Sequence, residues 1–325
     1  MKINKYPASY LTCLPSVSDS IFVSSASYET RCLTVPQAIG RRCKKAYLFW
    51  IDELCPAIGV NLGKMKECLG NVESVTTNLS DPINSASVID KSVDGMLRGE
   101  SKVNLLVDIT TFTHEHLLFL LKSLYSRKEK INSLKCVYAS AVEYSYDQTG
   151  ERKWLSKGCK EVRSVIGYPG MLYPGADTLL MIVVGFEYER ASCVIDEMSP
   201  DALYLGFGSP DSVTSDAHKG PQEQFNNMLA SNISIRKDVK KFVFSASDPV
   251  GALTQLKAVI ERTPGYNHIV VPMNTKLSTL AVASLGLHNK DVQLCYAQPD
   301  TYNFDSYSQP GEDVYLIDVT DFMLS

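Results

Sequence analysis

The sequence predicts an α/β protein made of two tandem units, each built on an open and mostly parallel sheet. Short apolar segments alternate with helical segments of about 10–15 residues, which is the pattern of parallel βαβ units. The apolar segments are continuous rather than alternating, as expected of strands covered by helices on both faces. A set of residues also recurs along the chain at a constant spacing. Together these observations indicate that one unit occurs twice.

The expected elements of the first unit follow in order along the chain. The strands are Ile21–Ser25, Ala46–Trp50, Val72–Thr76, Val103–Ile109 and Leu134–Ala141. The helices are Thr30–Ile39, Asn61–Leu69, Ser85–Leu97 and Glu115–Tyr125, the first of them ended by Gly40. An extended return segment follows at Trp154–Ile166. Glycines and prolines at positions 167–175 then interrupt the pattern. We therefore predict a domain boundary at residue 170, with units 1–170 and 171–325.

The second unit repeats this scheme, so both units are expected to be Rossmann-like. Its strands are Leu179–Val184, Ala202–Phe207, Ile233–Ile235, His268–Val271 and Val292–Ala297, with a final strand at Val314–Asp318. Its helices are Glu189–Met198, Gln222–Ala230, Pro249–Arg262 and Leu277–Leu285.

A repeated motif links the two units. The pattern YAxxxxYx[YF]D begins at Tyr138 and again at Tyr296, so that Tyr144 and Tyr302 are 158 positions apart. Glu29 and Glu187, after the first strand of each unit, have the same separation. We predict that the units arose by internal duplication and that these pairs occupy equivalent positions. The tyrosines suit either packing of the fifth strand or stacking on bases.

Composition narrows the classes of function. The chain has 325 residues, 45% hydrophobic and 21% charged, which suits two globular domains of roughly 100–200 residues each. A net charge of −4 argues against binding of extended nucleic acid. The nine cysteines form no CxxC pair, so we expect a reducing compartment and no disulfide or zinc framework. The N-terminal residues lack the apolar core of a signal peptide, and no apolar run approaches the about 20 residues of a bilayer span. We expect a cytoplasmic protein without membrane contact.

A ligand site is predicted where the strand order reverses. With the order 3-2-1-4-5, the loops after strands one and four face a common crevice. Free N–H groups at the helix starts favour an anion, and an arginine can bind phosphate in bidentate fashion. We therefore expect a nucleotide-type small molecule. The candidate ligand-binding residues are Ser25, Ser27, Arg31, Asp108, Thr110 and Thr113 in the first unit, and Glu187, Arg190, Asn274, Thr275 and Lys276 in the second.

The loop after strand four carries a family resemblance. The string DITTFTHEHLLFLL, from Asp108 to Leu121, resembles the strand-four signature of CARF-type domains, and Asn274-Thr275-Lys276 is similar to its Thr-Lys part. CARF-type domains bind cyclic oligonucleotides across a two-fold dimer in prokaryotic antiviral systems. The resemblance implies a bacterial sensor whose two units imitate that dimer, with a protein partner in a defence complex.

Each candidate also has a structural interpretation. The hydroxyls suit helix caps, and each arginine suits an ion pair with its neighbouring glutamate. Glu29 and Glu187 suit either a catalytic acid, base or nucleophile or a first-turn acid of a helix. His114 and His116 are two positions apart and point in different directions on a helix, so no metal is expected.

Walker A, GxGxxG and GxSxG motifs are all missing, so no cofactor is expected.

The sequence is compatible with three functions. The first function is a ligand-binding or sensor protein. The second is an enzyme acting on a nucleotide or its glycosidic bond, and the third is a structural subunit of a larger complex.

Overall fold

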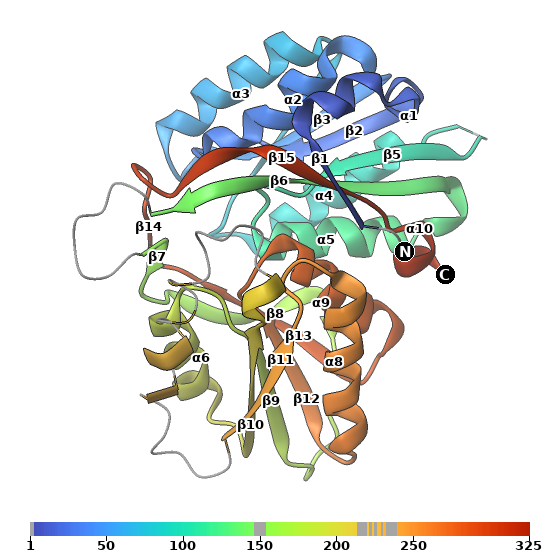
Figure 1. The fold of residues 1–325 in the computed structure, drawn as a ribbon. Helices are drawn as coiled ribbons and strands as arrows, with labels where there is room; N and C mark the ends of the chain where they lie inside the picture. The colour runs from blue at the N-terminus through green and yellow to red at the C-terminus, as the bar shows by residue number, and fades with distance from the viewer. Residues whose placement is uncertain are drawn as a thin grey trace. The chain divides into compact units, whose positions relative to one another are not determined.

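The computed structural model divides the chain into a first and a second compact unit. It describes residues 3–99, 101–145, 154–212 and 239–325, with a few positions between 220 and 231. Unit 1 contains Met1–Val142 together with Ser308–Ser325, and unit 2 contains Glu143–Tyr307. The last strand of the chain therefore belongs to the first unit, as the colours of Figure 1 make visible.

Unit 1 is built on a sheet with the order β1-β15-β6-β5-β2-β3-β4. Its strands are β1 (Ile3–Pro7), β2 (Ser20–Ser25), β3 (Lys45–Ile51), β4 (Val72–Thr77), β5 (Val103–Asp108), β6 (Ile131–Tyr144) and β15 (Ser308–Asp318). Strands β2 to β6 run parallel to one another, whereas β1 is antiparallel to β15. The helices of unit 1 are α1 (Pro15–Ser18), α2 (Thr34–Ile39), α3 (Pro56–Leu69), α4 (Pro82–Met96), α5 (His114–Tyr125) and α10 (Thr320–Leu324).

Unit 2 is built on a sheet with the order β11-β10-β9-β12-β13-β8. Its strands are β8 (Glu161–Pro169), β9 (Thr178–Val183), β10 (Ala202–Gly208), β11 (Val239–Phe244), β12 (Asn267–Pro272) and β13 (Val292–Gln298). Strand β8 is antiparallel to β13, and the others are parallel. The short strands β7 (Ser156–Lys157) and β14 (Thr301–Tyr302) pair with each other. The helices described in unit 2 include α6 (Tyr188–Met198), α8 (Pro249–Arg262) and α9 (Lys276–His288).

The central strands have the same order in both sheets. Reading β2 to β6 and β9 to β13 as strands one to five of each unit, both orders are the expected 3-2-1-4-5. The first strands, Ser20–Ser25 and Thr178–Val183, are also 158 positions apart. The α/β class with mostly parallel open sheets is therefore confirmed. Descent of the two units from one duplicated sequence stays a prediction.

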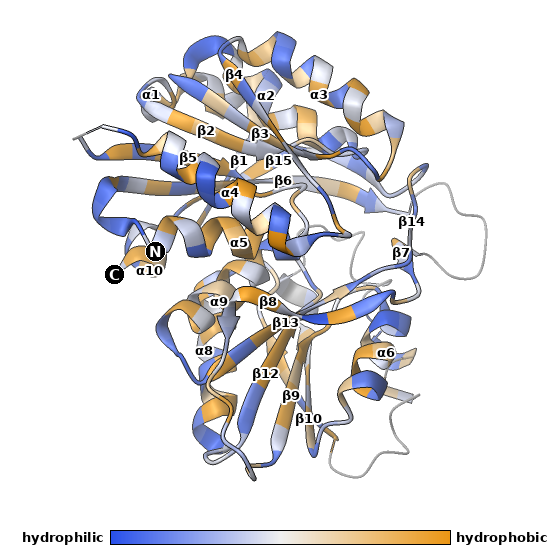
Figure 2. Cartoon of the chain, turned by 180° about the vertical axis from the view of Figure 1, so that it is seen from behind, coloured by the Kyte–Doolittle hydropathy of each residue, from blue (hydrophilic) through white to orange (hydrophobic). Residues whose placement is uncertain are grey.

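Helix caps and the buried strands explain why these segments form the elements. Asp81 and Thr113 accept N–H groups at the starts of α4 and α5, and Asp248 and Thr275 do the same at α8 and α9. The first strands are almost completely buried in both units. Figure 2 shows the strands β9 and β12 largely in hydrophobic colours, in agreement with their continuous apolar sequences. Within the described residues, the chain has no helix long and apolar enough to cross a membrane.

The unit boundaries differ from the expected division at residue 170. Strand β8 follows β6 in the chain but pairs with β13 in unit 2. Strand β15, the expected final strand of the second unit, instead lies between β1 and β6 of unit 1. Each unit thus receives its return strand from the connection that follows the other unit's fifth strand. A turn-rich segment shows where a chain bends, but it does not show which sheet the next strand joins.

Two edge strands were not expected from the sequence. Strand β1 precedes the first predicted element, and β11 contains Lys240 and Lys241, which interrupt its apolar pattern. The expected strand Ile233–Ile235 lies outside the described residues, as does much of the expected helix Gln222–Ala230.

Candidate functional site

The candidate site of unit 1 lies where β2 and β5 end, at the switch point of the sheet. Asp108, the last residue of β5, is completely buried. Its carboxylate accepts hydrogen bonds from Ser24 Oγ at 3.1 Å, Thr110 N at 3.1 Å and Thr110 Oγ1 at 2.5 Å. Burial raises the pKa of Asp108 to about 6, although the hydrogen bonds from Thr110 and Ser24 act in the opposite direction. Asp108 therefore organises the strand ends.

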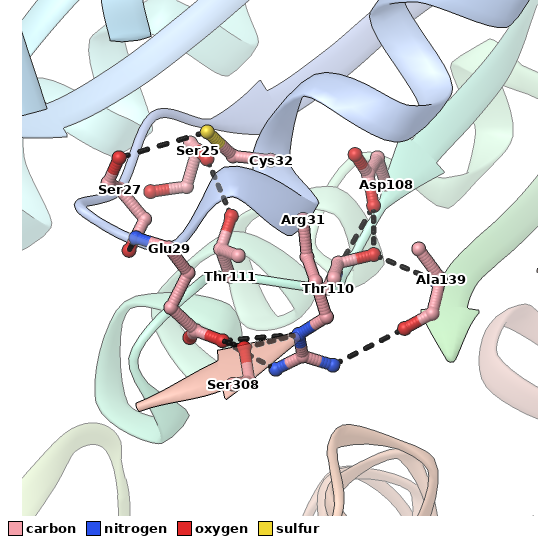
Figure 3. Close-up of polar contacts among 10 residues, drawn as sticks. All are labelled: Ser25, Ser27, Glu29, Arg31, Cys32, Asp108, Thr110, Thr111, Ala139 and Ser308. Atoms are coloured by element: carbon pink, nitrogen blue, oxygen red, sulfur yellow. Dashed lines mark hydrogen bonds and ion pairs between the residues drawn. The ribbon is translucent and has the colours of Figure 1, made fainter. Parts of the chain in front are cut away.

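The neighbouring hydroxyls bind the loops to each other. Thr110 Oγ1 accepts the N–H of Ala139 at 2.9 Å, and Thr111 Oγ1 donates to the carbonyl of Ser25 at 2.6 Å (Figure 3). Thr113 caps α5 by accepting the N–H of His116 at 3.1 Å. Ser25 and Ser27 are buried, and Ser27 Oγ accepts the N–H of Glu29 at 3.3 Å. Of the four hydroxyls expected as helix caps, Thr113 caps a helix, whereas Ser25, Ser27 and Thr110 contact loop backbone or Asp108 instead. Thr113 is half-exposed.

Arg31 is the centre of a closed polar cluster in unit 1. Its guanidinium forms an ion pair with Glu29 at 2.6 Å, and the two side chains are 3% and 8% exposed. Arg31 Nε donates to Ser308 Oγ at 2.9 Å, while Nη1 donates to the carbonyl of Ala139 at 3.2 Å. Ser308 Oγ in turn donates to Glu29 Oε2 at 2.6 Å. Figure 3 shows the guanidinium enclosed by these three partners. Arg31 therefore fastens β15 and β6 to the loop after β2.

Unit 2 contains a cluster of the same composition. Arg190 forms an ion pair with Glu187, and the side chains are 7% and 9% exposed. Arg190 Nη1 donates to the carbonyl of Ala297 at 3.4 Å, and Ser156 Oγ donates to Glu187 Oε1. The pKa of Arg190 is raised: burial alone lowers it, but the Glu187 carboxylate and the nearby tyrosine hydroxyls raise it.

The two clusters differ at one guanidinium nitrogen. In unit 1, Arg31 Nε donates to both Ser308 and Glu29. In unit 2, Arg190 Nε is buried and has no hydrogen-bond partner among the described residues. Because buried polar groups are nearly always paired, this unmatched donor needs an explanation.

Unit 2 also contains a group of aromatic side chains. The hydroxyls of Tyr296, Tyr302 and Tyr307 raise the pKa of Arg190. The ring centroid of Tyr144 lies 5.6 Å from that of Phe186 and 6.4 Å from that of Tyr307. Except for Tyr296, which is buried, these rings are half-exposed. The second tyrosines of both repeated motifs, Tyr144 and Tyr302, are therefore brought into one unit.

The loop after β12 completes the switch point of unit 2. Asn274 Nδ2 donates to the carbonyl of Val184 at 2.5 Å. Thr275 caps α9 by accepting the N–H of Ser278 at 3.1 Å, and its Oγ1 donates to the carbonyl of Ala246 at 2.6 Å. Lys276 begins α9 and is half-exposed. Asn274 and Thr275 therefore hold neighbouring loops together, as Thr110 and Thr111 do in unit 1.

Sequence reasoning missed the serines and the backbone acceptors. Ser308 is 277 positions from Arg31, and Ser156 is 31 positions from Glu187, so no local pattern points to either contact. His114 and His116 are buried in α5, with exposed fractions of 8% and 2%. Within the described residues, no group of three or more histidine, cysteine, aspartate or glutamate side chains is placed to hold a metal ion.

Comparisons with known proteins find solved structures of low sequence identity. No family model matches the chain, and no curated protein matches it. The cytoplasmic domain of a prokaryotic cation chloride cotransporter is 10% identical over 88% of this chain and 98% of that one, with a TM-score of 0.25. The N-domain of a bacterial malonyl-CoA reductase, solved with NADP, is 8% identical over 82% of this chain and 77% of that one, with a TM-score of 0.24.

Proposed function

We propose that the chain binds a nucleotide-type, anionic small molecule in unit 2 and acts as a ligand-binding or sensor protein. The observation that carries this proposal is the buried Nε of Arg190, which has no hydrogen-bond partner among the described residues. A buried donor without an acceptor costs about 1–3 kcal/mol. A phosphate oxygen suits it well as an acceptor, because charge-assisted hydrogen bonds are the strong ones.

The aromatic rings of unit 2 favour a nucleotide over inorganic phosphate. Tyr144, Phe186 and Tyr307 pack together in unit 2, and Tyr302 acts on the arginine charge. Stacking of a base on an aromatic side chain contributes about 1–3 kcal/mol. A ligand with both a phosphate and a base uses both features.

Binding is favoured over catalysis by the state of the two glutamates. Glu187 is paired with Arg190 and accepts the hydroxyl of Ser156. Glu29 is paired with Arg31 and accepts the hydroxyl of Ser308. A general acid, base or nucleophile at either position has to break a buried ion pair first. The proposed enzyme acting on a nucleotide or its glycosidic bond is thus the weaker alternative.

The resemblance to CARF-type domains extends this proposal to a ligand and a setting. It suggests a cyclic oligonucleotide as the bound molecule, and a bacterial, cytoplasmic antiviral system as the setting, with a protein partner in a defence complex. Cyclic oligonucleotides therefore belong in the set of ligands to be tested, beside AMP, ATP and inorganic phosphate.

Isothermal titration calorimetry on the full chain tests the proposal. We expect a nucleotide to bind more tightly than inorganic phosphate. Arg190→Lys keeps the charge but loses the Nε donor, so it should weaken binding roughly tenfold or more. Arg31→Lys is the matched control in unit 1 and should change the affinity less than about twofold.

A second pair of variants guards against effects of folding. Tyr302→Leu removes a ring of the cluster and should weaken nucleotide binding, while Tyr173→Leu, at a ring that is 52% exposed, should not. Absence of nucleotide binding at millimolar concentration, or equal losses in the Arg190 and Arg31 variants, contradicts the proposal.

A further inference from the structure

Strand β4 forms one edge of the sheet in unit 1. It pairs with β3 on one side, and no strand of the described residues pairs with its other side. Its sequence contains no proline, and its register against β3 is continuous from Val72 to Thr77. Glu73, Ser74 and Thr76 are exposed. An edge of this kind presents a row of N–H and carbonyl groups that can pair with a further strand.

The hydrogen bonds to β3 show which residues of β4 have their backbone groups at the outer edge. The N–H of Ala46 donates to the carbonyl of Asn71 at 2.9 Å, and Ala46 lies opposite Val72. Because successive backbone groups of a strand point to opposite sides, the odd-numbered residues of β4 bond to β3. The N–H and carbonyl groups of Val72, Ser74 and Thr76 therefore point to the outer edge.

The other sheet edges carry features that hinder pairing. Strand β1 ends at Pro7. Strand β8 ends at Pro169, and its register against β13 shifts. Strand β11 has exposed lysines at Lys240 and Lys241. Prolines, bulges and lysines are means by which natural proteins block the pairing of edge strands, and β4 has none of them.

Strands β4 and β11 hold equivalent places in the two sheets but differ at their centre. Each is the third strand of the order 3-2-1-4-5, and each has six residues. The N–H of Ser209 donates to the carbonyl of Phe244 at 2.8 Å, so Lys241 faces the outer edge of β11 as Ser74 faces that of β4. Antiparallel pairing of two copies centred on Lys241 sets two like charges directly opposite, which is destabilising. At Ser74 the same pairing brings together two small uncharged side chains.

We propose that two copies of the chain form a dimer by antiparallel pairing of their β4 strands about a two-fold axis at Ser74. In this register Ser74 lies opposite its own copy and Val72 lies opposite Thr76, so the backbone groups at the outer edge all find partners. Glu73 keeps its ion pair with Lys45 of its own chain, at 2.6 Å, so no unpaired charge enters the interface. The two seven-stranded sheets become one continuous sheet. The pairing does not depend on the proposed binding of a nucleotide.

Sedimentation velocity on the full chain tests the interface. We expect an equilibrium between monomer and dimer that shifts to the dimer as the concentration rises. Ser74→Pro removes an N–H from the outer edge but no hydrogen bond to β3, so it should keep the fold and weaken dimerisation by about tenfold or more. Lys241→Pro is the matched control at the equivalent place in β11 and should leave dimerisation unchanged. A chain that stays monomeric at millimolar concentration, or equal losses in the two variants, overturns the proposal.

Hydrogen exchange of the unmodified chain gives a second test that does not depend on the folding of a variant. The amides of Ser74 and Thr76 should exchange slowly in concentrated protein and faster after dilution. Those of Lys241 and Val243, at the outer edge of β11, should exchange at the same rate in both. A dimer in which the amides of β4 show no protection places the interface elsewhere and overturns the proposal.

A cross-link tests the register. The Cα atoms of a hydrogen-bonded antiparallel pair lie about 5.5 Å apart, within the range that a disulfide spans. Oxidised glutathione should therefore join two chains of Ser74→Cys through the new thiols, whereas two chains of Lys241→Cys should not be joined at position 241. Linkage at 241 but not at 74 contradicts the assignment of the interface to β4.

Discussion

Arg31 donates a guanidinium N–H to the carbonyl oxygen of Ala139, 3.2 Å away, at the end of the parallel part of unit 1. Arg190 makes the same contact with Ala297 at 3.4 Å in unit 2, and the two alanines are 158 positions apart. Each arginine is also paired with the glutamate of the same loop. Both arginines therefore connect the loop after strand one to strand five of their unit.

The connections to the return strands are related in the same way. The N–H of Ser145 donates to the carbonyl of Tyr307 at 2.9 Å, and the N–H of Asn303 donates to that of Leu155 at 2.9 Å. Ser145 and Asn303 are 158 positions apart, and Leu155 and Tyr307 are 152 apart. The two donors thus keep the repeat spacing of 158, whereas the two acceptors do not.

The position of β15 in unit 1 leads to a prediction about truncation. Deleting Ser308–Ser325 removes the strand between β1 and β6 and also removes Ser308 from the Arg31 cluster. We expect the shortened chain to lose cooperative unfolding of unit 1, as measured by near-ultraviolet circular dichroism and thermal unfolding. A chain that lacks only Leu324 and Ser325 is the control and should unfold like the full chain. A cooperative transition retained without β15 would show that unit 1 does not depend on this strand.

The buried ion pair of unit 1 predicts a large single-variant effect. Arg31→Met leaves the Glu29 carboxylate buried without its partner, which typically costs about 3–5 kcal/mol of unfolding free energy. Replacing both residues by apolar ones, Arg31→Met with Glu29→Leu, should recover much of that loss. Urea unfolding of the wild type, both single variants and the double variant measures the coupling. If Arg31→Met alone changes the unfolding free energy by less than about 0.5 kcal/mol, the buried pair contributes no more to stability than a surface ion pair does.

Asp108 predicts a specific dependence of stability on pH. Its pKa is raised from 3.8 to about 6 in the folded chain, so folding favours the protonated carboxyl. This contribution is fully present below the unfolded pKa and is lost as the pH rises from about 4 to 6. Relative to Asp108→Asn, the wild type should lose about 2–3 kcal/mol of unfolding free energy over this range. Urea unfolding of both proteins at pH 4, 5, 6 and 7 measures the difference. A constant difference, or one that grows in favour of the wild type, contradicts the assignment.

The positions of the central strands along the chain could be predicted because that information is local, whereas their order followed from the expected Rossmann-like fold. Continuous apolar runs marked nine of the central strands within a few residues, and the bounds Pro249–Arg262 of α8 match the expected helix. The third strand of unit 2 was the exception, since the lysines of β11 hide its apolar character. The partners of β8 and β15 could not be predicted, because pairing with a distant sheet leaves no mark on the strand itself.

The position of the candidate site could be predicted from the sequence. Which of its side chains still have N–H groups free to bind a ligand could not. Arg31 was expected to bind a ligand, and it lies at the switch point, but Glu29, Ser308 and Ala139 already accept its N–H groups. Arg190 has a matching sequence context yet keeps an unpartnered Nε among the described residues. Arg31 Nε reaches both Ser308 and Glu29 in unit 1. In unit 2, Ser156 reaches only the glutamate. Such a distinction depends on tertiary geometry alone.

Gly185 at the switch point of unit 2 carries the last prediction. A Cβ on this residue would lie 1.9 Å from the carbonyl oxygen of Met273, so the loops after β9 and β12 approach too closely for any other residue. Gly185→Ala has to push these loops apart and disturb the bond from Asn274 to Val184. We expect a loss of about 1–3 kcal/mol in unfolding free energy, the usual cost of overpacking. Gly59→Ala in α3 is the matched control: nothing lies within 4 Å of its Cβ, and alanine should stabilise that helix by about 0.5–1 kcal/mol. Urea unfolding measures the change in unfolding free energy of both variants. A Gly185→Ala variant at least as stable as the wild type would show that the loops of unit 2 can separate without cost.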